Sequence, residues 1–135
     1  FYQIVRFNPN SSYHLSMGIN YPNASDRHFS DPKRPGGAIY IPGSCGSQGC
    51  IPIGDVNIEE VYWLAWKAAQ QGQQYIQVHI FPFRLTPDKM EKMTNLYLRQ
   101  RHFWENLQPV YAYFEKNSTM PVVEVDETGR YRIKP

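Results

Sequence analysis

The part of the sequence with the clearest chemical potential is a glycine-rich segment, residues 42–50, that ends on Cys50. Glycine allows positive φ angles and close backbone approach, so several N–H groups of such a loop can point into one space. A cysteine at the end of the loop then has donors nearby that favour its thiolate and can hold an oxyanion after attack. The segment predicts Cys50 as the nucleophile of an acyl transfer through a thioester. The alternative is a surface turn around an inert small residue.

A second thiol, Cys45, lies five residues before Cys50 in the same loop. Two cysteines this close form no disulfide framework, and two thiols alone are too few ligands for a structural zinc site. We therefore expect neither a metal nor another cofactor. Cys45 is either a packed small residue or a partner that oxidises with Cys50 and silences the nucleophile.

Three elements around the loop would position the cysteine. Residues 38–41 form a short apolar run that predicts a buried strand leading into the loop. Asn57 and Glu60 form a capping-box-like pair that predicts the start of a helix, which ends at Gly72. Residues 74–83 give the strongest strand pattern of the chain. We expect the two strands to be neighbours in one sheet, with the helix crossing between them and packing on it.

The sequence before the loop predicts mainly strands. Residues 2–7 and 13–19 alternate as two strands that we expect to pair, and residues 20–37 are rich in turn formers and predict a loop. At the other end of the chain, residues 121–133 predict a closing hairpin.

Helices are expected late in the chain. Thr86 and Pro87 are typical of a helix start, and the helical pattern continues with a break to residue 114, with Pro109 kinking or dividing it. The fold class predicted is α+β: a mainly β core with inserted helices, in a single domain over residues 1–135. Aromatic residues at helical spacing predict core packing, with a glycan-stacking surface as the alternative: Trp63, Trp66, Phe103 and Trp104.

Composition limits the classes of function. The chain has 135 residues, 41% of them hydrophobic and 15% aromatic, which is typical of a globular domain and argues against disorder. The net charge is only +2, and the basic residues are scattered, so we expect no nucleic-acid partner, whereas an anionic polymer remains compatible. No window approaches the roughly 20 apolar residues of a membrane span.

The segment Gly43-Ser44-Cys45-Gly46-Ser47-Gln48-Gly49-Cys50 resembles the active-site loop of L,D-transpeptidase (YkuD-type) catalytic domains, in which a His-Gly pair is followed by Ser-x-Gly-Cys. Further segments resemble a subgroup with a short spacing between these motifs, which includes murein transpeptidases, L,D-carboxypeptidases and amidases that release wall-linked lipoprotein. These segments are Phe7-Asn8-Pro9-Asn10-Ser11, Ile19-Asn20-Tyr21-Pro22-Asn23 with Asp26-Arg27, and Val78-His79-Ile80-Phe81-Pro82-Phe83-Arg84. Because such domains begin with additional strands, the resemblance implies an N-terminally shortened L,D-transpeptidase-like core, located in the bacterial cell envelope (periplasm or cell surface).

The resemblance also implies residue roles. Cys50 would form a thioester with the diaminopimelate carbonyl of a peptidoglycan tetrapeptide stem and pass the acyl group to an amine or to water. Gly49 and Cys50 would offer backbone N–H groups to the oxyanion, Ser47 would hold the loop by hydrogen bonds, and Gly43 matches the glycine of the His-Gly pair. Arg27 and Arg84 are candidates for binding substrate carboxylates, with structural ion pairs as the alternative.

The sequence departs from the family pattern at the histidine. Pro42 stands immediately before Gly43, where the resemblance implies the histidine, and proline cannot take a proton from a thiol. Gln48 stands where the wider family has a second histidine. His79 is the candidate to replace the missing catalytic histidine, with a half-buried structural role as the alternative.

Three interpretations of function follow. The first is a cysteine enzyme of peptidoglycan remodelling, either transpeptidase or hydrolase, which the intact Ser47-Gln48-Gly49-Cys50 favours. The second is a catalytically impaired homologue that binds wall peptide or a partner enzyme, which Pro42 favours. The third is a truncated product with neither role.

Overall fold

The computed structural model describes residues 1–46 and 49–134, and the chain divides into two compact units, Phe1–His79 and Ile80–Pro135. Both units combine helices with antiparallel strands, which confirms the predicted α+β class. The single domain over residues 1–135 remains a prediction.

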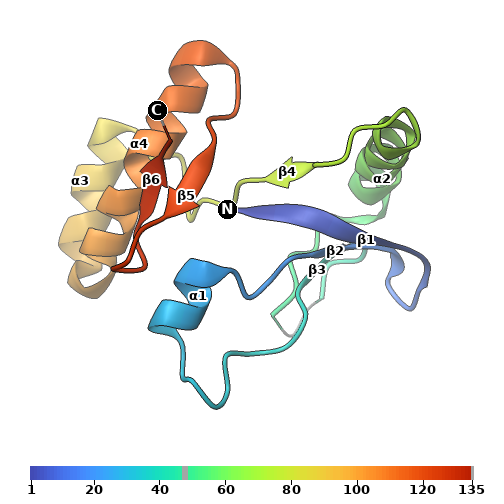
Figure 1. Cartoon of the computed structure of the whole chain (residues 1–135), viewed down its shortest axis with the longest axis horizontal. Helices are drawn as coiled ribbons and strands as arrows, with labels where there is room; N and C mark the ends of the chain where they lie inside the picture. The colour runs from blue at the N-terminus through green and yellow to red at the C-terminus, as the bar shows by residue number, and fades with distance from the viewer. Residues whose placement is uncertain (47–48, 135) are drawn as a thin grey trace. The chain divides into compact units, whose positions relative to one another are not determined.

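The first unit contains a four-stranded antiparallel sheet and two helices (Figure 1). The strands, in spatial order, are β3 (Tyr40–Pro42), β2 (His14–Ile19), β1 (Tyr2–Ser11) and β4 (Gln77–Val78). The helices are α1 (Ala24–Phe29) and α2 (Asp55–Gln70). The predicted pairing of the first two strands is confirmed, and these two strands form the centre of the sheet.

The two strands that flank α2 in sequence share one sheet, as predicted, but they are not neighbours. β3 and β4 lie at opposite edges, with β2 and β1 between them. The prediction of adjacency is wrong because the chain after Cys50 takes the outer edge of β3, where the Ile51 and Ile53 N–H groups donate to β3 carbonyls. β4 instead pairs with the free edge of β1. The predicted strand over 74–83 is also shorter, since only Gln77 and Val78 pair with β1.

Side chains alternate across this sheet and separate its two faces. On one face, Phe7, Met17 and Ile41 form a row across β1, β2 and β3. This row packs against α2, where the Tyr62 ring meets the Phe7 ring edge-on at 5.3 Å and Ile58 is fully buried. The hydrophobic core of the unit therefore lies between α2 and one face of the sheet, and the side chains on the opposite face do not contribute to this core.

Two helix starts differ from the sequence prediction. The predicted loop over 20–37 contains α1, which begins with a capping box: the Asn23 side chain accepts from the Asp26 N–H, and the Asp26 carboxylate accepts from the Asn23 N–H, both at 2.9 Å. Helix α2 begins at Asp55 rather than after an Asn57 cap. Gly54, at φ +83°, turns the chain into the helix, and Asn57 instead donates to a backbone carbonyl of the preceding turn.

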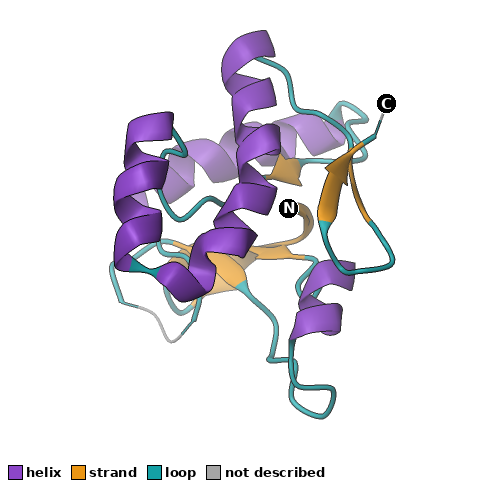
Figure 2. Ribbon diagram, turned by 90° about the vertical axis from the view of Figure 1, so that its left-hand side faces the viewer, coloured by secondary structure: helices purple, strands orange, loops and turns teal. Residues whose placement is uncertain are grey.

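The second unit consists of helices and a short hairpin (Figure 2). Its elements are α3 (Pro87–Leu96), a 3₁₀ turn (Leu98–Gln100), α4 (Arg101–Asn117), β5 (Val123–Val125) and β6 (Tyr131–Ile133). The helix start at Thr86-Pro87 and the closing hairpin are confirmed. The helical break falls in the 3₁₀ turn, and Pro109 does not divide α4.

The aromatic side chains at helical spacing divide between core and surface. Trp104 is buried in the second unit, whereas Trp63 and Phe103 are 55% and 50% exposed, so core packing was the wrong prediction for these two. On α2 the Trp63 and Trp66 rings stack at 5.9 Å, and the Lys67 ammonium lies over both.

None of the helices in the described part of the chain is long and apolar enough to cross a membrane.

Met17 offers a test of the core beneath the sheet. Its side chain is fully buried, so Met17→Ala removes apolar contacts and leaves a cavity, at a cost of about 2–5 kcal/mol in the free energy of unfolding. Chemical denaturation would measure the loss. The matched control is Val5→Ala on β1, where the side chain is 63% exposed and we expect a change of roughly 0.5 kcal/mol or less. Equal effects of the two substitutions would contradict the assignment of this core.

Candidate functional site

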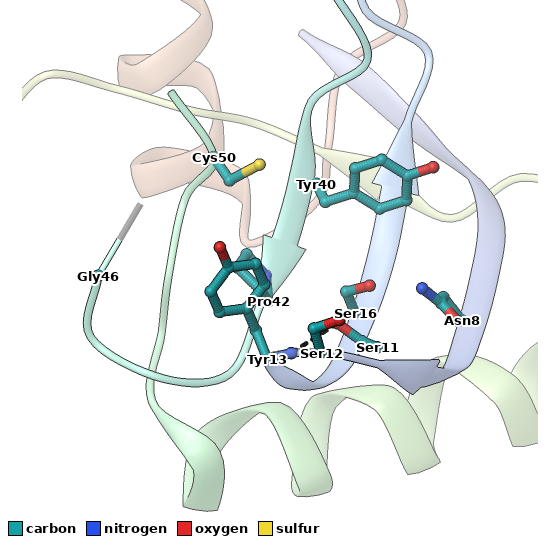
Figure 3. Close-up of a pocket in the computed structure, with 9 residues that line it drawn as sticks. All are labelled: Asn8, Ser11, Ser12, Tyr13, Ser16, Tyr40, Pro42, Gly46 and Cys50. Atoms are coloured by element: carbon teal, nitrogen blue, oxygen red, sulfur yellow. Dashed lines mark hydrogen bonds between the residues drawn. The ribbon is translucent and has the colours of Figure 1, made fainter. Parts of the chain in front are cut away.

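A cavity of about 300 Å³ lies in the first unit and is named here the Cys50 cavity (Figure 3). Its lining is small or polar and comes from the β1–β2 hairpin, β3 and the glycine-rich loop: Asn8, Ser11, Ser12, Tyr13, Ser16, Tyr40, Pro42, Gly46 and Cys50. The volume is at the lower end of the range for small-molecule sites, which suits one residue of a peptide rather than a long segment.

Strand register places Pro42 in this cavity. Asn8 pairs with Ser16 across β1 and β2, and Ser16 pairs with Pro42 across β2 and β3, so the three residues form one row. This row alternates with the row of Phe7, Met17 and Ile41 and therefore faces away from α2. Any side chain at position 42 faces the cavity that Cys50 lines.

The chain after Cys50 is fixed against the outer edge of β3. The Ile51 N–H donates to the Tyr40 carbonyl at 2.9 Å, and the Ile53 N–H donates to the Pro42 carbonyl at 3.1 Å. Because both partners advance by two residues in the same direction, this segment runs parallel to β3. Cys50 therefore lies one residue before the first of these bonds. In Figure 3 its sulfur points toward the space between its own segment and Tyr40.

The start of the glycine-rich loop is held by a carboxylate from α2. Asp55, the first residue of that helix, accepts a hydrogen bond from the Ser44 N–H at 2.6 Å. The same carboxylate oxygen would lie 2.6 Å from a Cβ on Gly43, and the Tyr13 carbonyl would lie 2.9 Å from it. Gly43 is thus a glycine for steric reasons, because β3, the β1–β2 hairpin and α2 meet there. Sequence reasoning missed Asp55, although an acid in a first helical turn was visible.

The end of the loop is partly described. Gly49 has φ +101°, a conformation that favours glycine, and it is exposed. Ser47 lies outside the described residues, as does Gln48. The oxyanion roles of the Gly49 and Cys50 N–H groups remain predictions. Cys45 is exposed, and both cysteines are thiols.

His79 follows β4, at the sheet edge opposite β3. Three strand spacings separate those edges, roughly 14 Å. The His79 ring packs edge-on against the Phe1 ring at 4.8 Å and does not line the Cys50 cavity. Burial lowers the pKa of His79 from 6.5 to about 4. The geometry gives no support to the predicted catalytic role and agrees with a half-buried structural histidine.

Of the other predicted side chains in the first unit, Arg27 is exposed on α1 and does not line the cavity. Arg84 belongs to the second unit, and its predicted role remains a prediction. His14 turns toward α2, where its Nε2 lies 2.6 Å from Glu59 Oε1. No histidine occurs among the described residues that line the Cys50 cavity.

Sequence reasoning missed the two tyrosines of the cavity. The Tyr13 hydroxyl points toward Cys50 in Figure 3, and the Tyr40 hydroxyl accepts a hydrogen bond from Arg6 Nη1 at 3.1 Å. Tyr13 precedes β2 and Tyr40 begins β3, so alternation along β1 and β2 does not identify either residue. The pairing register was not readable from one strand alone.

The chain was compared with protein-family models and with curated proteins. No family model matches the chain. The chain is 36% identical over 133 residues to "Putative L,D-transpeptidase YafK" of Escherichia coli strain K12, and to the protein of the same name from Escherichia coli O157:H7. The match covers 97% of this chain and 52% of those proteins, so the chain spans about half the length of the curated relatives it matches.

Gly43→Ala tests the steric role of this glycine. The added methyl would meet the Asp55 carboxylate and a backbone carbonyl, and we expect a loss of about 1–3 kcal/mol in the free energy of unfolding. The matched control is Gly37→Ala, because nothing lies within 4 Å of a Cβ there. Thermal or chemical denaturation compares the two. A Gly43→Ala protein as stable as the control would show that the loop start has room to spare.

His79 predicts a dependence of stability on pH. Its folded pKa of about 4 lies below the ordinary 6.5, so between these values the unfolded chain binds a proton that the folded chain does not. The free energy of unfolding should therefore fall as the pH falls from 6.5 to 4, by about 1 kcal/mol once solvent screening of the half-buried ring is allowed for. His79→Gln should flatten this slope and His28→Gln, an exposed control, should not. An unchanged slope in His79→Gln would contradict the assignment.

Proposed function

Because the chain belongs to the L,D-transpeptidase family, we propose that it acts on the stem peptide of peptidoglycan, with Cys50 as the nucleophile of a thioester step. The observation that carries this proposal is that Cys50 and residue 42 line one cavity, on the sheet face that the core does not use. The family likeness supports the peptidoglycan-modifying role. A location in the cell envelope belongs to the same proposal.

The proposed step needs a thiolate and a proton donor. The Cys50 sulfur attacks the carbonyl carbon of a stem-peptide amide, a C–S bond forms, and the C–N bond breaks as the leaving amine takes up a proton. The thioester then passes its acyl group to an amine or to water. The described lining of the cavity contains Pro42 and no imidazole, so the proposed step lacks the usual base on that lining. Loss of a general base costs on the order of 10² to 10⁴ in rate.

A second candidate is a catalytically impaired homologue that binds wall peptide or a partner. The observation that favours it is the histidine-free lining described above, together with the distance of β4 from β3. In this case binding persists while turnover of the bound peptide is lost. Both candidates share the Cys50 cavity as the binding site, and they differ only in whether the thioester forms.

The proline itself is compatible with the strand. The Gly43 N–H donates to the Leu15 carbonyl, and the Ile19 N–H donates to the Ile39 carbonyl. In an antiparallel pair, hydrogen-bonded and non-hydrogen-bonded residue pairs alternate, so the pair of Pro42 with Ser16 is a non-hydrogen-bonded one. Pro42 thus occupies a position where its missing N–H removes no bond to β2. A substitution at this position should therefore leave the β2–β3 ladder intact and place its side chain in the cavity.

Pro42→His tests the enzyme proposal. We expect release of the terminal D-residue from a purified muropeptide to rise by up to 10²- to 10⁴-fold, because an imidazole at this position can accept the thiol proton. Pro42→Asn is the matched control, since it removes the ring without adding a base and should stay near the wild-type rate. Cys50→Ala added to Pro42→His should abolish the gain.

The remaining outcomes separate the two candidates. Rapid wild-type turnover that is lost in Cys50→Ala would mean that another group serves as the base. Equal activation by Pro42→His and Pro42→Asn would refute the base at position 42. Retained peptide binding without turnover in any variant would favour the impaired homologue.

A further inference from the structure

A second row of residues crosses the sheet beside the row that contains Pro42. Arg6 pairs with Gly18 across β1 and β2, and Gly18 pairs with Tyr40 across β2 and β3. These residues lie two positions along each strand from Asn8, Ser16 and Pro42 and therefore share the sheet face of the Cys50 cavity. Tyr40 lines the cavity, so this row extends from the cavity to the guanidinium of Arg6.

Gly18 allows the outer two residues of the row to meet. A Cβ on Gly18 would lie 3.1 Å from the Tyr40 ring and 3.3 Å from the Arg6 Cβ, closer than an ordinary contact. Without that side chain, the Tyr40 ring reaches across β2, and Arg6 Nη1 donates to the Tyr40 hydroxyl oxygen at 3.1 Å. The pair is thus held by the register of three strands.

The hydrogen-bond inventory of this pair leaves donors available. Arginine has only donors, so the Tyr40 oxygen is the acceptor in their bond, and the hydroxyl hydrogen remains available for another group. The Arg6 side chain is exposed and forms no ion pair with any carboxylate of the described residues. The described lining of the Cys50 cavity likewise contains no acidic side chain.

We propose that Arg6 and Tyr40 form a carboxylate-binding subsite beside Cys50, which takes a free carboxylate of the peptide substrate. The guanidinium supplies a planar pair of N–H donors and a positive charge, and the hydroxyl supplies one further donor. This inference rests on the proposed function and names the residue that recognises the substrate. The carboxylate belongs either to the C-terminus of the stem peptide or to the side chain of its diaminopimelate residue.

The test measures peptide binding, which needs no turnover. Isothermal titration compares the tetrapeptide with two derivatives, one amidated at the C-terminus and one at the diaminopimelate side chain. We expect Arg6→Gln to weaken binding of the tetrapeptide at least 10-fold and Tyr40→Phe to weaken it several-fold. Arg34→Gln, which changes an exposed arginine elsewhere in the first unit, should leave the affinity unchanged.

The amidated peptides identify the carboxylate. The derivative that lacks the recognised carboxylate should bind wild type and Arg6→Gln equally, which also shows that the variant is folded. If Arg6→Gln weakens all three peptides alike, or none of them, the inference is overturned. Absence of any binding to the wild type overturns it as well.

A second readout separates this inference from the proposed function. Mass spectrometry of Pro42→His with the tetrapeptide detects an acyl group on Cys50. Arg6-dependent binding without this adduct would refute the thioester step and leave the subsite standing. The KM for adduct formation is compared between Pro42→His and the double variant Pro42→His/Arg6→Gln. Equal KM values in the two proteins would refute the subsite and leave the thioester step standing.

Discussion

The register of β2 against its two neighbours is the constraint on which the rest of the first unit depends. Met17 is fully buried toward α2, while Ser16, the adjacent residue, is 3% exposed and faces the Cys50 cavity. Because side chains alternate along a strand, the core and the cavity share one short strand, and a slip of one residue would exchange them. The core thereby fixes the positions of Pro42 and Tyr40 on β3, although neither contributes to the packing on α2.

The two ends of the glycine-rich loop are held next to the same strand, β3. Its start is held by the Asp55 carboxylate, and the chain beyond Cys50 is held by backbone hydrogen bonds to β3. Both ends are thus fixed by groups that take no part in the proposed chemistry. This explains how a proline can stand at position 42 without disturbing the position of the cysteine: the N–H it lacks is not used in the β2–β3 ladder, and its carbonyl still accepts from Ile53.

Local sequence patterns predicted the elements better than their arrangement. The strand leading into the loop, the helix start at Pro87 and the closing hairpin were readable because each depends on neighbouring residues. The capping box of α1 was readable too and was missed beneath the turn-forming residues around it. The order of strands and the pairing of Arg6 with Tyr40 were not readable, because they depend on how three strands align, and one sequence carries no direct signal for that.

In the proposed site, peptide binding and thioester formation depend on different residues, so the departure from the family pattern at position 42 affects only the second of them. Binding a carboxylate requires a guanidinium and a hydroxyl that are held in place, and the row of Arg6, Gly18 and Tyr40 depends only on strand register. Forming a thioester also requires a base within reach of the sulfur. On the proposed mechanism, proline in place of histidine would remove the base and leave the strand register untouched, so it would lower the rate of the chemical step without altering the proposed subsite. A single substitution of this kind would convert the proposed enzyme site into a binding site.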